Sequence, residues 1–214
     1  MQLLSLNVGQ PRSVEWQGHT VQTSIFKTPV ADRRKVSLLH IEGDAQADLR
    51  VHGGKDKAVY AYDSSYYERW KTVLDRINWS PGLFGENLTT EGLPDDKVYV
   101  GNIYRCGTTL LQAVQPRFPC FKLNIKFGLP DMIQRFYAQQ MHGTYFRVLE
   151  AGDLQVGDPI QLIEVSAFSV TIKDVVTAFT TQGADPEMLQ QILHIPYLPE
   201  SLRPTFQKFR VKHT

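Results

Sequence analysis

Short apolar runs separated by turn residues occupy the first three quarters of the chain. The runs are rich in β-branched and aromatic residues, as strands are. Segments such as "NVGQPR", "EGDAQ" and "QVGD" lie between them and are typical of turns. Many short strands at this spacing favour a barrel or a sandwich, and a barrel leaves no open edge. The predicted strands cover residues 3–8, 20–26, 35–41, 58–62, 97–100, 109–115, 144–150 and 158–165.

Two helices are predicted among these strands, where the apolar period changes from two to about 3.6. Residues 64–77 begin with serines suited to an N-cap, and residues 129–141 have a proline near the first helical position. The apolar face of the first consists of Tyr67, Trp70, Val73, Leu74 and Ile77, and that of the second of Met132, Ile133, Phe136 and Tyr137.

The pattern becomes helical after residue 165. Thr171 and Asp174 have the spacing of a capping box, "DPEMLQQIL" opens with an Asp-Pro cap, and a third helix can start at Pro199 or Pro204. We therefore expect a mainly β protein in two parts, a β-barrel over residues 1–165 and a small three-helix unit over residues 166–214.

Composition narrows the class of protein. The chain has 214 residues, a formal net charge of +1 and two cysteines. A charge this small argues against a dedicated nucleic-acid binder, and two cysteines do not make a disulfide scaffold. The N-terminus lacks the basic region of a signal peptide, and no apolar run approaches the roughly 18 residues of a membrane span. We expect a cytoplasmic protein.

Common catalytic motifs are missing from the sequence. The six histidines form neither HExxH nor a His-x3-His pair, and the cysteines are not in CxxC spacing. No GxGxxG, P-loop or GxSxG motif occurs. A metal held by protein ligands alone is therefore not expected.

Three other stretches carry candidate chemistry. In "DLRVHGGKDKAVYAY" (48–62), glycines allow close backbone approach, and cationic side chains around them can bind an anion. In "LFGENLTTEGL" (83–93), Gly85 and Asn87 are turn formers, and amide and hydroxyl groups can bond a polar heterocycle. A surface loop and a hairpin turn are the plain alternatives.

The third stretch is "QPRFPCFKL" (115–123). Pro116 and Pro119 fix the backbone around Cys120, so its side chain is held in one direction. Arg117 and Lys122 nearby favour the thiolate over the thiol. The plain alternative is that Cys120 is a small buried apolar residue, as most free cysteines are.

The order of these stretches resembles the MOSC domain, a family named after the C-terminal domain of molybdenum-cofactor sulfurases. The resemblance rests on "VHGGKDKAVYAY", "GLFGENLTTEGL", "LQAVQPRFPCFKL" and "GTYFRVLEAGDLQVGDPIQL", and the three-helix tail is similar to that of YiiM-like members. It implies a β-barrel that binds the molybdenum cofactor, with the Cys120 thiolate as metal ligand and catalytic residue. It also implies two-electron reduction of N-hydroxylated compounds such as hydroxylamines, N-hydroxylated bases and amidoximes.

The resemblance also implies cofactor contacts. Asn87 and Thr89 are expected to face the pterin or the metal, and Arg147 and the basic residues around "HGG" are candidates for the phosphate. The full predicted cofactor-binding set is Arg50, His52, Gly53, Gly54, Lys55, Lys57, Asn87, Thr89, Arg117 and Arg147.

Electrons have to come from outside, because the sequence shows no flavin, nicotinamide or Fe–S motif. The predicted partners are a separate flavin or Fe–S reductase and a small N-hydroxylated substrate. A homodimer is allowed, and membrane or nucleic acid is not expected.

Two other functions stay open. The chain could carry the cofactor or its sulfur, with a persulfide on Cys120, or it could be a regulatory module whose helical tail binds DNA or protein. Four basic and no acidic residues between 203 and 212 suit the second alternative, but they are better explained as partners of the C-terminal end of the last helix dipole.

Overall fold

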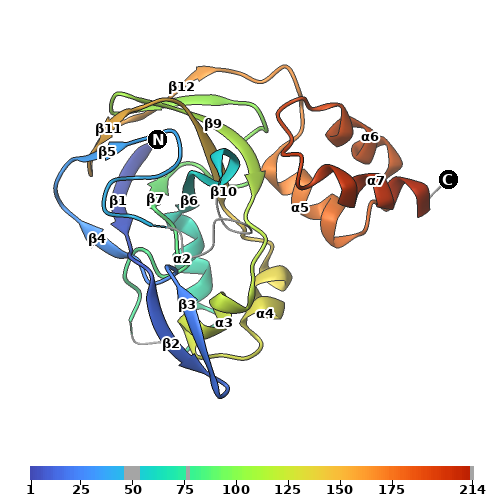
Figure 1. The fold of residues 1–214 in the computed structure, drawn as a ribbon. Coiled ribbons are helices and arrows are strands. Elements are labelled where there is room, and N and C mark those ends of the chain that lie inside the picture. The colour runs from blue at the N-terminus through green and yellow to red at the C-terminus, as the bar shows by residue number, and fades with distance from the viewer. Residues whose placement is uncertain (46–53, 76–77, 213–214) are drawn as a thin grey trace.

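A large mixed sheet forms the centre of the molecule. The computed structural model describes residues 1–45, 54–75 and 78–212 (Figure 1). Eight strands follow the order β12-β8-β9-β10-β6-β7-β1-β4, in which only β6 and β7 run parallel. Their bounds are β1 Gln2–Val8, β4 Thr28–Val30, β6 Val59–Asp63, β7 Leu88–Glu91, β8 Ile103–Cys106, β9 Thr109–Pro116, β10 Thr144–Glu150 and β12 Ile160–Glu164.

The predicted closed barrel is not confirmed. Among the strands of the described residues, β12 and β4 form the two ends of the sheet order. The start of β12 still meets β1 through an isolated bridge between Gln2 and Pro159, and the Leu3 amide donates to the Asp158 carbonyl at 3.0 Å. The sheet therefore curves far enough for β1 to contact the segment that precedes β12.

Two smaller strand pairs flank this sheet. β5 (Arg34–Val36) pairs with β11 (Gly152–Leu154), and β2 (Arg12–Trp16) forms a hairpin with β3 (His19–Thr23). The hairpin extends away from the large sheet (Figure 1). The strand predicted at 97–100 is wrong. Lys97 lies in a turn, in which its amide donates to the Pro94 carbonyl at 2.9 Å, and Tyr99 makes an isolated bridge to Thr171.

Helix α2 (Ser64–Lys71) is shorter than predicted. Its N-cap is Asp63, whose side chain accepts a hydrogen bond from the Ser65 amide, so the serines occupy the first turn and not the cap. The helix ends at Lys71, Val73 beyond it is exposed, and the predicted face residue Ile77 lies outside the described residues. Trp70 keeps its predicted place in the core and donates from Nε1 to the Tyr62 hydroxyl at 2.7 Å.

Two further helices connect β9 to β10. α4 (Met132–Gln139) follows the helical pattern predicted there and buries Met132 and Phe136. α3 (Phe121–Phe127) is not predicted by the sequence pattern, because seven residues give fewer than two full turns of periodicity. Cys120 is its N-cap residue and Gly128, with a left-handed backbone, ends it.

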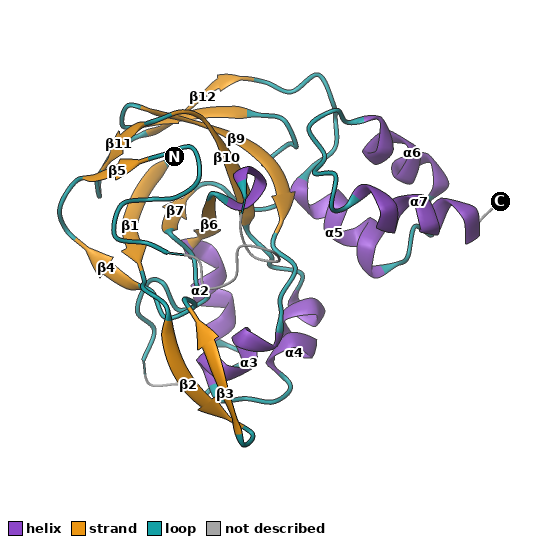
Figure 2. Cartoon of the chain, in the orientation of Figure 1, coloured by secondary structure: helices purple, strands orange, loops and turns teal. Residues whose placement is uncertain are grey.

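The last part of the chain forms three helices, α5 (Ile172–Thr180), α6 (Pro186–His194) and α7 (Arg203–Lys212), beside the sheet (Figure 2). The predicted capping box of Thr171 and Asp174 is confirmed, and Asp185 caps α6 at the predicted position. Buried side chains of these helices and of the sheet belong to one continuous hydrophobic cluster. The division at residue 165 stays a prediction.

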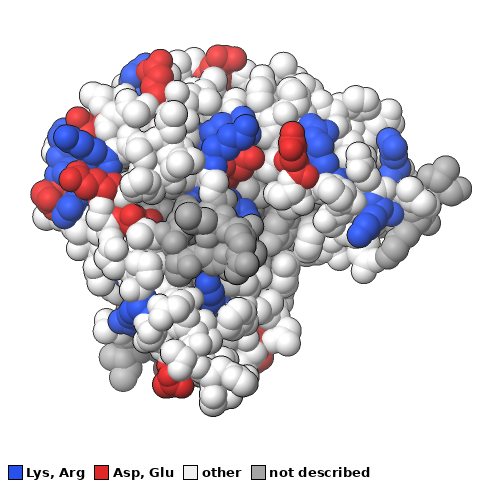
Figure 3. All heavy atoms as spheres, in the orientation of Figure 1, with Lys and Arg blue, Asp and Glu red and all other residues white. Residues whose placement is uncertain are grey.

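Arg203, one of the basic residues of this helical part, has a local role. Arg203 donates from Nη1 to the Leu193 carbonyl at 2.9 Å and from Nη2 to the Ile195 carbonyl at 2.6 Å, so it caps the C-terminal end of α6 rather than that of the last helix. On the face shown in Figure 3, described Lys and Arg side chains are interspersed with Asp and Glu. Within the described residues, every helix is too short or too polar to cross a lipid bilayer.

Candidate functional site around Cys120

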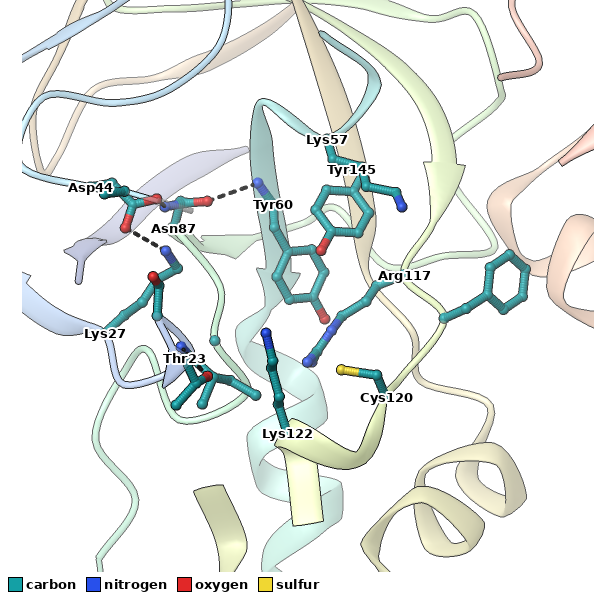
Figure 4. Close-up of a pocket in the computed structure, with 15 residues that line it drawn as sticks. Thr23, Lys27, Asp44, Lys57, Tyr60, Asn87, Arg117, Cys120, Lys122 and Tyr145 are labelled. Carbon is teal, nitrogen blue, oxygen red and sulfur yellow. Dashed lines mark hydrogen bonds and ion pairs between the residues drawn. The ribbon is translucent and has the colours of Figure 1, made fainter. Parts of the chain in front are cut away.

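Cys120 lies where a strand turns into a helix. β9 ends at Pro116 and α3 begins at Phe121, so Cys120 is an N-cap with an extended backbone (φ −124°, ψ 173°). Its side chain makes no capping hydrogen bond, and the half-buried thiol is free of any disulfide. Figure 4 shows the sulfur directed toward the Arg117 side chain.

The Cys120 side chain lines a cavity of about 100 Å³. Segments far apart in the sequence meet here: the end of β3, the loops at 44–45 and 85–87, and strands β6 and β10. Its lining residues, called the Cys120 cavity below, are Thr23, Ser24, Ile25, Lys27, Asp44, Ala45, Lys57, Tyr60, Gly85, Asn87, Arg117, Phe118, Cys120, Lys122 and Tyr145.

Arg117 gives this cavity a buried cation. The residue is 6% exposed, and its Nη1 donates to the Phe84 carbonyl at 2.5 Å. Its guanidinium carbon lies 5.2 Å from the centre of the Tyr60 ring. In the described part of the chain no carboxylate forms an ion pair with it. A buried charge without a counter-ion is costly, so this arrangement favours binding of an anion.

Lys27, by contrast, is already paired. Its ammonium lies 2.5 Å from Asp44 Oδ1, and burial lowers the pKa of Lys27. Asp44 also accepts from the Gly9 amide at 2.8 Å and from Asn87 Nδ2 at 2.9 Å. This network joins the N-terminal loops to the "FGEN" turn. Because Asp44 balances the charge of Lys27, Lys27 is less available than Arg117 to bind an anion.

Asn87 reaches the cavity, but its amide holds the protein together. Its Oδ1 accepts from the Tyr60 amide at 3.1 Å, and its Nδ2 donates to Asp44 as described. Thr89 is not among the lining residues. Its hydroxyl donates to Glu86 at 2.8 Å and accepts from Asn7 at 3.1 Å. Pterin contacts by these two residues stay a prediction.

The "FGEN" turn itself is shaped by a glycine and a buried carboxylate. Gly85 has φ +79°, and a Cβ there would lie 2.8 Å from Cγ1 of Ile25. Glu86 accepts from the Gly82 amide at 2.8 Å and the Phe84 amide at 3.1 Å, and burial raises the pKa of Glu86. The predicted turn is confirmed, with a strand following directly as β7.

A second cavity, of about 630 Å³, contains most of the described phosphate candidates. Lys57 lines both cavities, which makes them neighbours. Arg147 donates from Nε and Nη2 to Asp56 Oδ1, so its charge already has a partner. The lining residues, called the Arg147 cavity below, are Gly54, Lys55, Asp56, Lys57, Gln115, Arg147, Pro196, Leu198, Pro199, Glu200 and Ser201. Arg50, His52 and Gly53 lie outside the described residues.

Two tyrosines of the site escaped sequence analysis. Tyr60 on β6 and Tyr145 on β10 are register partners, with ring centres 5.0 Å apart. Burial raises the pKa of each, so both hydroxyls stay protonated near neutral pH. No local sequence signal identifies such a pair, because it depends on the register of two strands more than 80 residues apart.

The loop that contains Arg117 is held by a buried polar pair, His142 and Asp95. His142 Nδ1 donates to the Arg117 carbonyl at 2.8 Å, and the His142 amide donates to Asp95 Oδ2 at 2.8 Å. Burial lowers the pKa of His142 to about 4 and raises that of Asp95 to about 7. His142 Nε2 is buried without a partner among the described residues.

Comparison with known proteins shows the family of this chain. The chain matches the MOSC domain over residues 48–161, which includes the glycine loop, the "FGEN" turn and Cys120. It is 35% identical to the uncharacterized protein YflK of Bacillus subtilis (strain 168), over 96% of this chain and 93% of that protein. It is 32% identical to protein YiiM of Escherichia coli (strain K12), over 88% and 85%.

Solved structures show the same relationship. The crystal structure of YiiM from Geobacillus stearothermophilus superposes with a TM-score of 0.82 at 35% identity, over 98% of each chain. YiiM from Escherichia coli superposes with a TM-score of 0.79, over 100% of this chain and 94% of the other. Because the sequence matches span most of this chain and of its relatives, the protein belongs to the MOSC-domain family.

Proposed function

We propose that this protein is a molybdenum-cofactor-dependent reductase of N-hydroxylated compounds. The observation that carries the proposal is the free Cys120 thiol beside the buried Arg117, whose charge no described carboxylate balances. A thiolate is a soft ligand suited to a metal of this kind, and a buried guanidinium can bind an anionic group next to it.

The described residues fit such a group. The Cys120 cavity alone is smaller than the 300–1,000 Å³ or so that small-molecule sites usually offer, but the Arg147 cavity adjoins it at Lys57. Ser24 Oγ, on the wall of the first cavity, is buried without a partner in the described residues and can donate to a polar ligand. Cys120 would hold the metal end, and Lys55, Lys57 and Arg147 would hold the phosphate.

The chain's own groups then bind and orient the substrate. When bound, the molybdenum cofactor supplies a redox-active metal that can deliver two electrons to an N–O bond. The overall reaction, R–NHOH + 2 e⁻ + 2 H⁺ → R–NH₂ + H₂O, consumes two protons. Tyr145 keeps its proton at neutral pH and lines the Cys120 cavity, so it can donate a hydrogen bond to the hydroxylamine oxygen. Arg117 can stabilise negative charge that develops beside it.

The electrons are proposed to come from a separate protein. A protein named "Reductase" from Gibberella moniliformis (strain M3125 / FGSC 7600) is 29% identical over 84% of this chain, which covers 32% of that longer protein. The rest of that protein has no counterpart here. The name of that protein supports reduction as the chemistry. A separate flavin or Fe–S reductase is the electron donor that we propose for this chain.

A sulfur carrier is the second candidate. The Cys120 thiol makes no hydrogen bond to the helix that it precedes, so it is available to hold a persulfide. In that case the cations of the Cys120 cavity would stabilise the persulfide anion rather than a cofactor. This function needs a partner that supplies the sulfur.

One experiment separates these functions. Freshly purified protein is analysed for molybdenum and pterin, and then assayed for hydroxylamine reduction with an artificial electron donor. The reductase proposal expects both the cofactor and turnover. Cofactor-free protein with a persulfide on Cys120, detected by mass spectrometry, would favour the carrier and overturn the reductase.

A further inference from the structure

Hydrogen bonds fix the loop that ends in Cys120 at both of its ends but not in its middle. At its start, the Arg117 amide donates to the Gly143 carbonyl at 3.3 Å, and the Arg117 carbonyl accepts from His142. At its end, the Cys120 carbonyl accepts from the Leu123 amide at 2.9 Å, in the first turn of α3. Pro119 has no N–H, and no backbone hydrogen bond of Phe118 is found within the described residues.

The middle of the loop is held by an aromatic contact with a distant helix. The ring centre of Phe118 lies 4.2 Å from that of Phe179 in α5, at an interplanar angle of 34°. Phe179 is held in turn by Tyr137 of α4, whose ring is stacked at 6.4 Å, and by Phe209 of α7 at 6.2 Å. Phe179 therefore connects three helices to the loop that carries the thiol.

We propose that Phe179 is a positioning residue for Cys120. It lies outside the Cys120 cavity and acts through Phe118, which lines it. Phe118 also meets the His142 ring edge-on, with ring centres 6.1 Å apart. Loss of the Phe179 ring would remove the closer of these two contacts. Because Arg117 has its own hydrogen bonds, Phe118 would then move and displace the sulfur relative to the cations at Arg117, Lys57 and Lys122. The inference rests on the proposed function in one respect, that Cys120 is the reactive residue. It gives the C-terminal helices a role in the site.

The test measures the charge around the sulfur and does not need the cofactor. The full chain, purified without cofactor, is alkylated at Cys120 by iodoacetate and by iodoacetamide, and the two rate constants are compared by mass spectrometry. Both reagents react with the same thiolate. The ratio of their rate constants is therefore independent of how exposed the sulfur is and of the fraction of Cys120 that is ionised. Nearby cations raise the rate for anionic iodoacetate. Cys106, which is fully buried, serves as an internal unreactive thiol.

Three variants make the comparison. Phe179→Leu removes the ring and keeps an apolar side chain, and Phe179→Tyr keeps the ring. Phe168→Leu is the matched control, because Phe168 packs on Tyr197 at 6.2 Å and, within the described residues, makes no ring contact with the loop. We expect Phe179→Leu to lower the iodoacetate-to-iodoacetamide ratio roughly two- to tenfold, the range of an aromatic contact. Phe179→Tyr and Phe168→Leu should keep the ratio of the unaltered chain.

Two outcomes would overturn the inference. One is an unchanged ratio in folded Phe179→Leu protein. The other is an equal fall in Phe168→Leu, which would mean that any loosening of the helices suffices. With the cofactor present, Phe179→Leu should lower kcat more than it raises KM. A chain that never carries molybdenum would defeat the proposed function and leave the alkylation result valid.

Discussion

Arg147 and Asp56 form a partly buried ion pair, in which Nε and Nη2 of the arginine donate to the same carboxylate oxygen at 2.7 and 2.5 Å. Their side chains are 21% and 22% exposed. The pair joins β10 to the short 3-10 helix η1 (Lys55–Lys57) on the wall of the Arg147 cavity. A phosphate that reaches Arg147 therefore has to share the guanidinium with Asp56.

Replacing Arg147 with Ala is expected to weaken cofactor retention about ten- to a hundredfold, because a charge-assisted hydrogen bond contributes about 1.5–3 kcal/mol. Molybdenum content after gel filtration measures it. Asp56→Asn is the control, since it frees the guanidinium, and its molybdenum content should hold or rise. Lower melting temperatures in both variants at unchanged molybdenum content would assign the pair to the fold alone.

Arg117 can be tested through two substitutions that differ in charge. Arg117→Lys keeps a cation in the Cys120 cavity but loses the fork that reaches the Phe84 carbonyl, whereas Arg117→Gln also removes the charge. We expect Gln to reduce molybdenum content more than Lys does, by tenfold or so. Equal content in the two variants would show that the charge of Arg117 does not bind the ligand.

The two cysteines allow a matched comparison. Cys120→Ser is expected to remove reduction of N-hydroxylated substrates, because a hard hydroxyl replaces a soft thiolate of similar size. Cys106→Ser should keep activity, since Cys106 lies buried on β8, where burial raises the pKa of its thiol to about 12. Turnover by Cys120→Ser, or its loss in a folded and loaded Cys106→Ser protein, would contradict the assignment.

The polar pair under the loop predicts a specific pH dependence of stability. The pKa of His142 falls from 6.5 to about 4 on folding, so the folded state disfavours its protonation. Its contribution, on the order of 3 kcal/mol, is present above pH 6.5 and is lost as the pH falls toward 4. Asp95 acts in the opposite direction, because burial raises its pKa to about 7 and the folded state takes up its proton first.

Urea unfolding at pH values from 7 to 4 separates the two residues. His142→Gln should lose less stability on acidification than the unaltered chain, and Asp95→Asn should lose more. Parallel curves for all three proteins would show that neither group titrates differently in the folded and unfolded states.

Local chemistry explains what the sequence predicted well. The capping box of Thr171 and Asp174 involves groups three residues apart, and the prolines beside Cys120 act on their own backbone. Contacts between residues far apart in the sequence could not be predicted in this way. The ion pair of Lys27 with Asp44 depends on how two loops meet, and the pairing of Tyr60 with Tyr145 depends on strand register.

The errors have equally physical causes. Residues 97–100 carry the β-branched and aromatic composition of a strand, yet the Pro94 carbonyl captures the Lys97 amide in a turn and Tyr99 makes only a single bridge to Thr171. Thr89 was predicted to face the cofactor, but its buried hydroxyl already forms hydrogen bonds with Glu86 and Asn7 inside the fold. Composition alone cannot show which polar groups the fold has already satisfied.

The position of Cys120 at the start of α3 makes thermal stability and the proposed activity favour different residues. Residue 120 is an N-cap whose side chain caps nothing, whereas Ser, Thr, Asp or Asn at such a position typically stabilises a protein by about 0.5–2 kcal/mol. A directed-evolution campaign that selects only for heat tolerance should therefore enrich these residues at position 120. Each of these residues would give a more stable protein that lacks the thiol. Libraries designed to raise the stability of this protein therefore need the codon for residue 120 held constant.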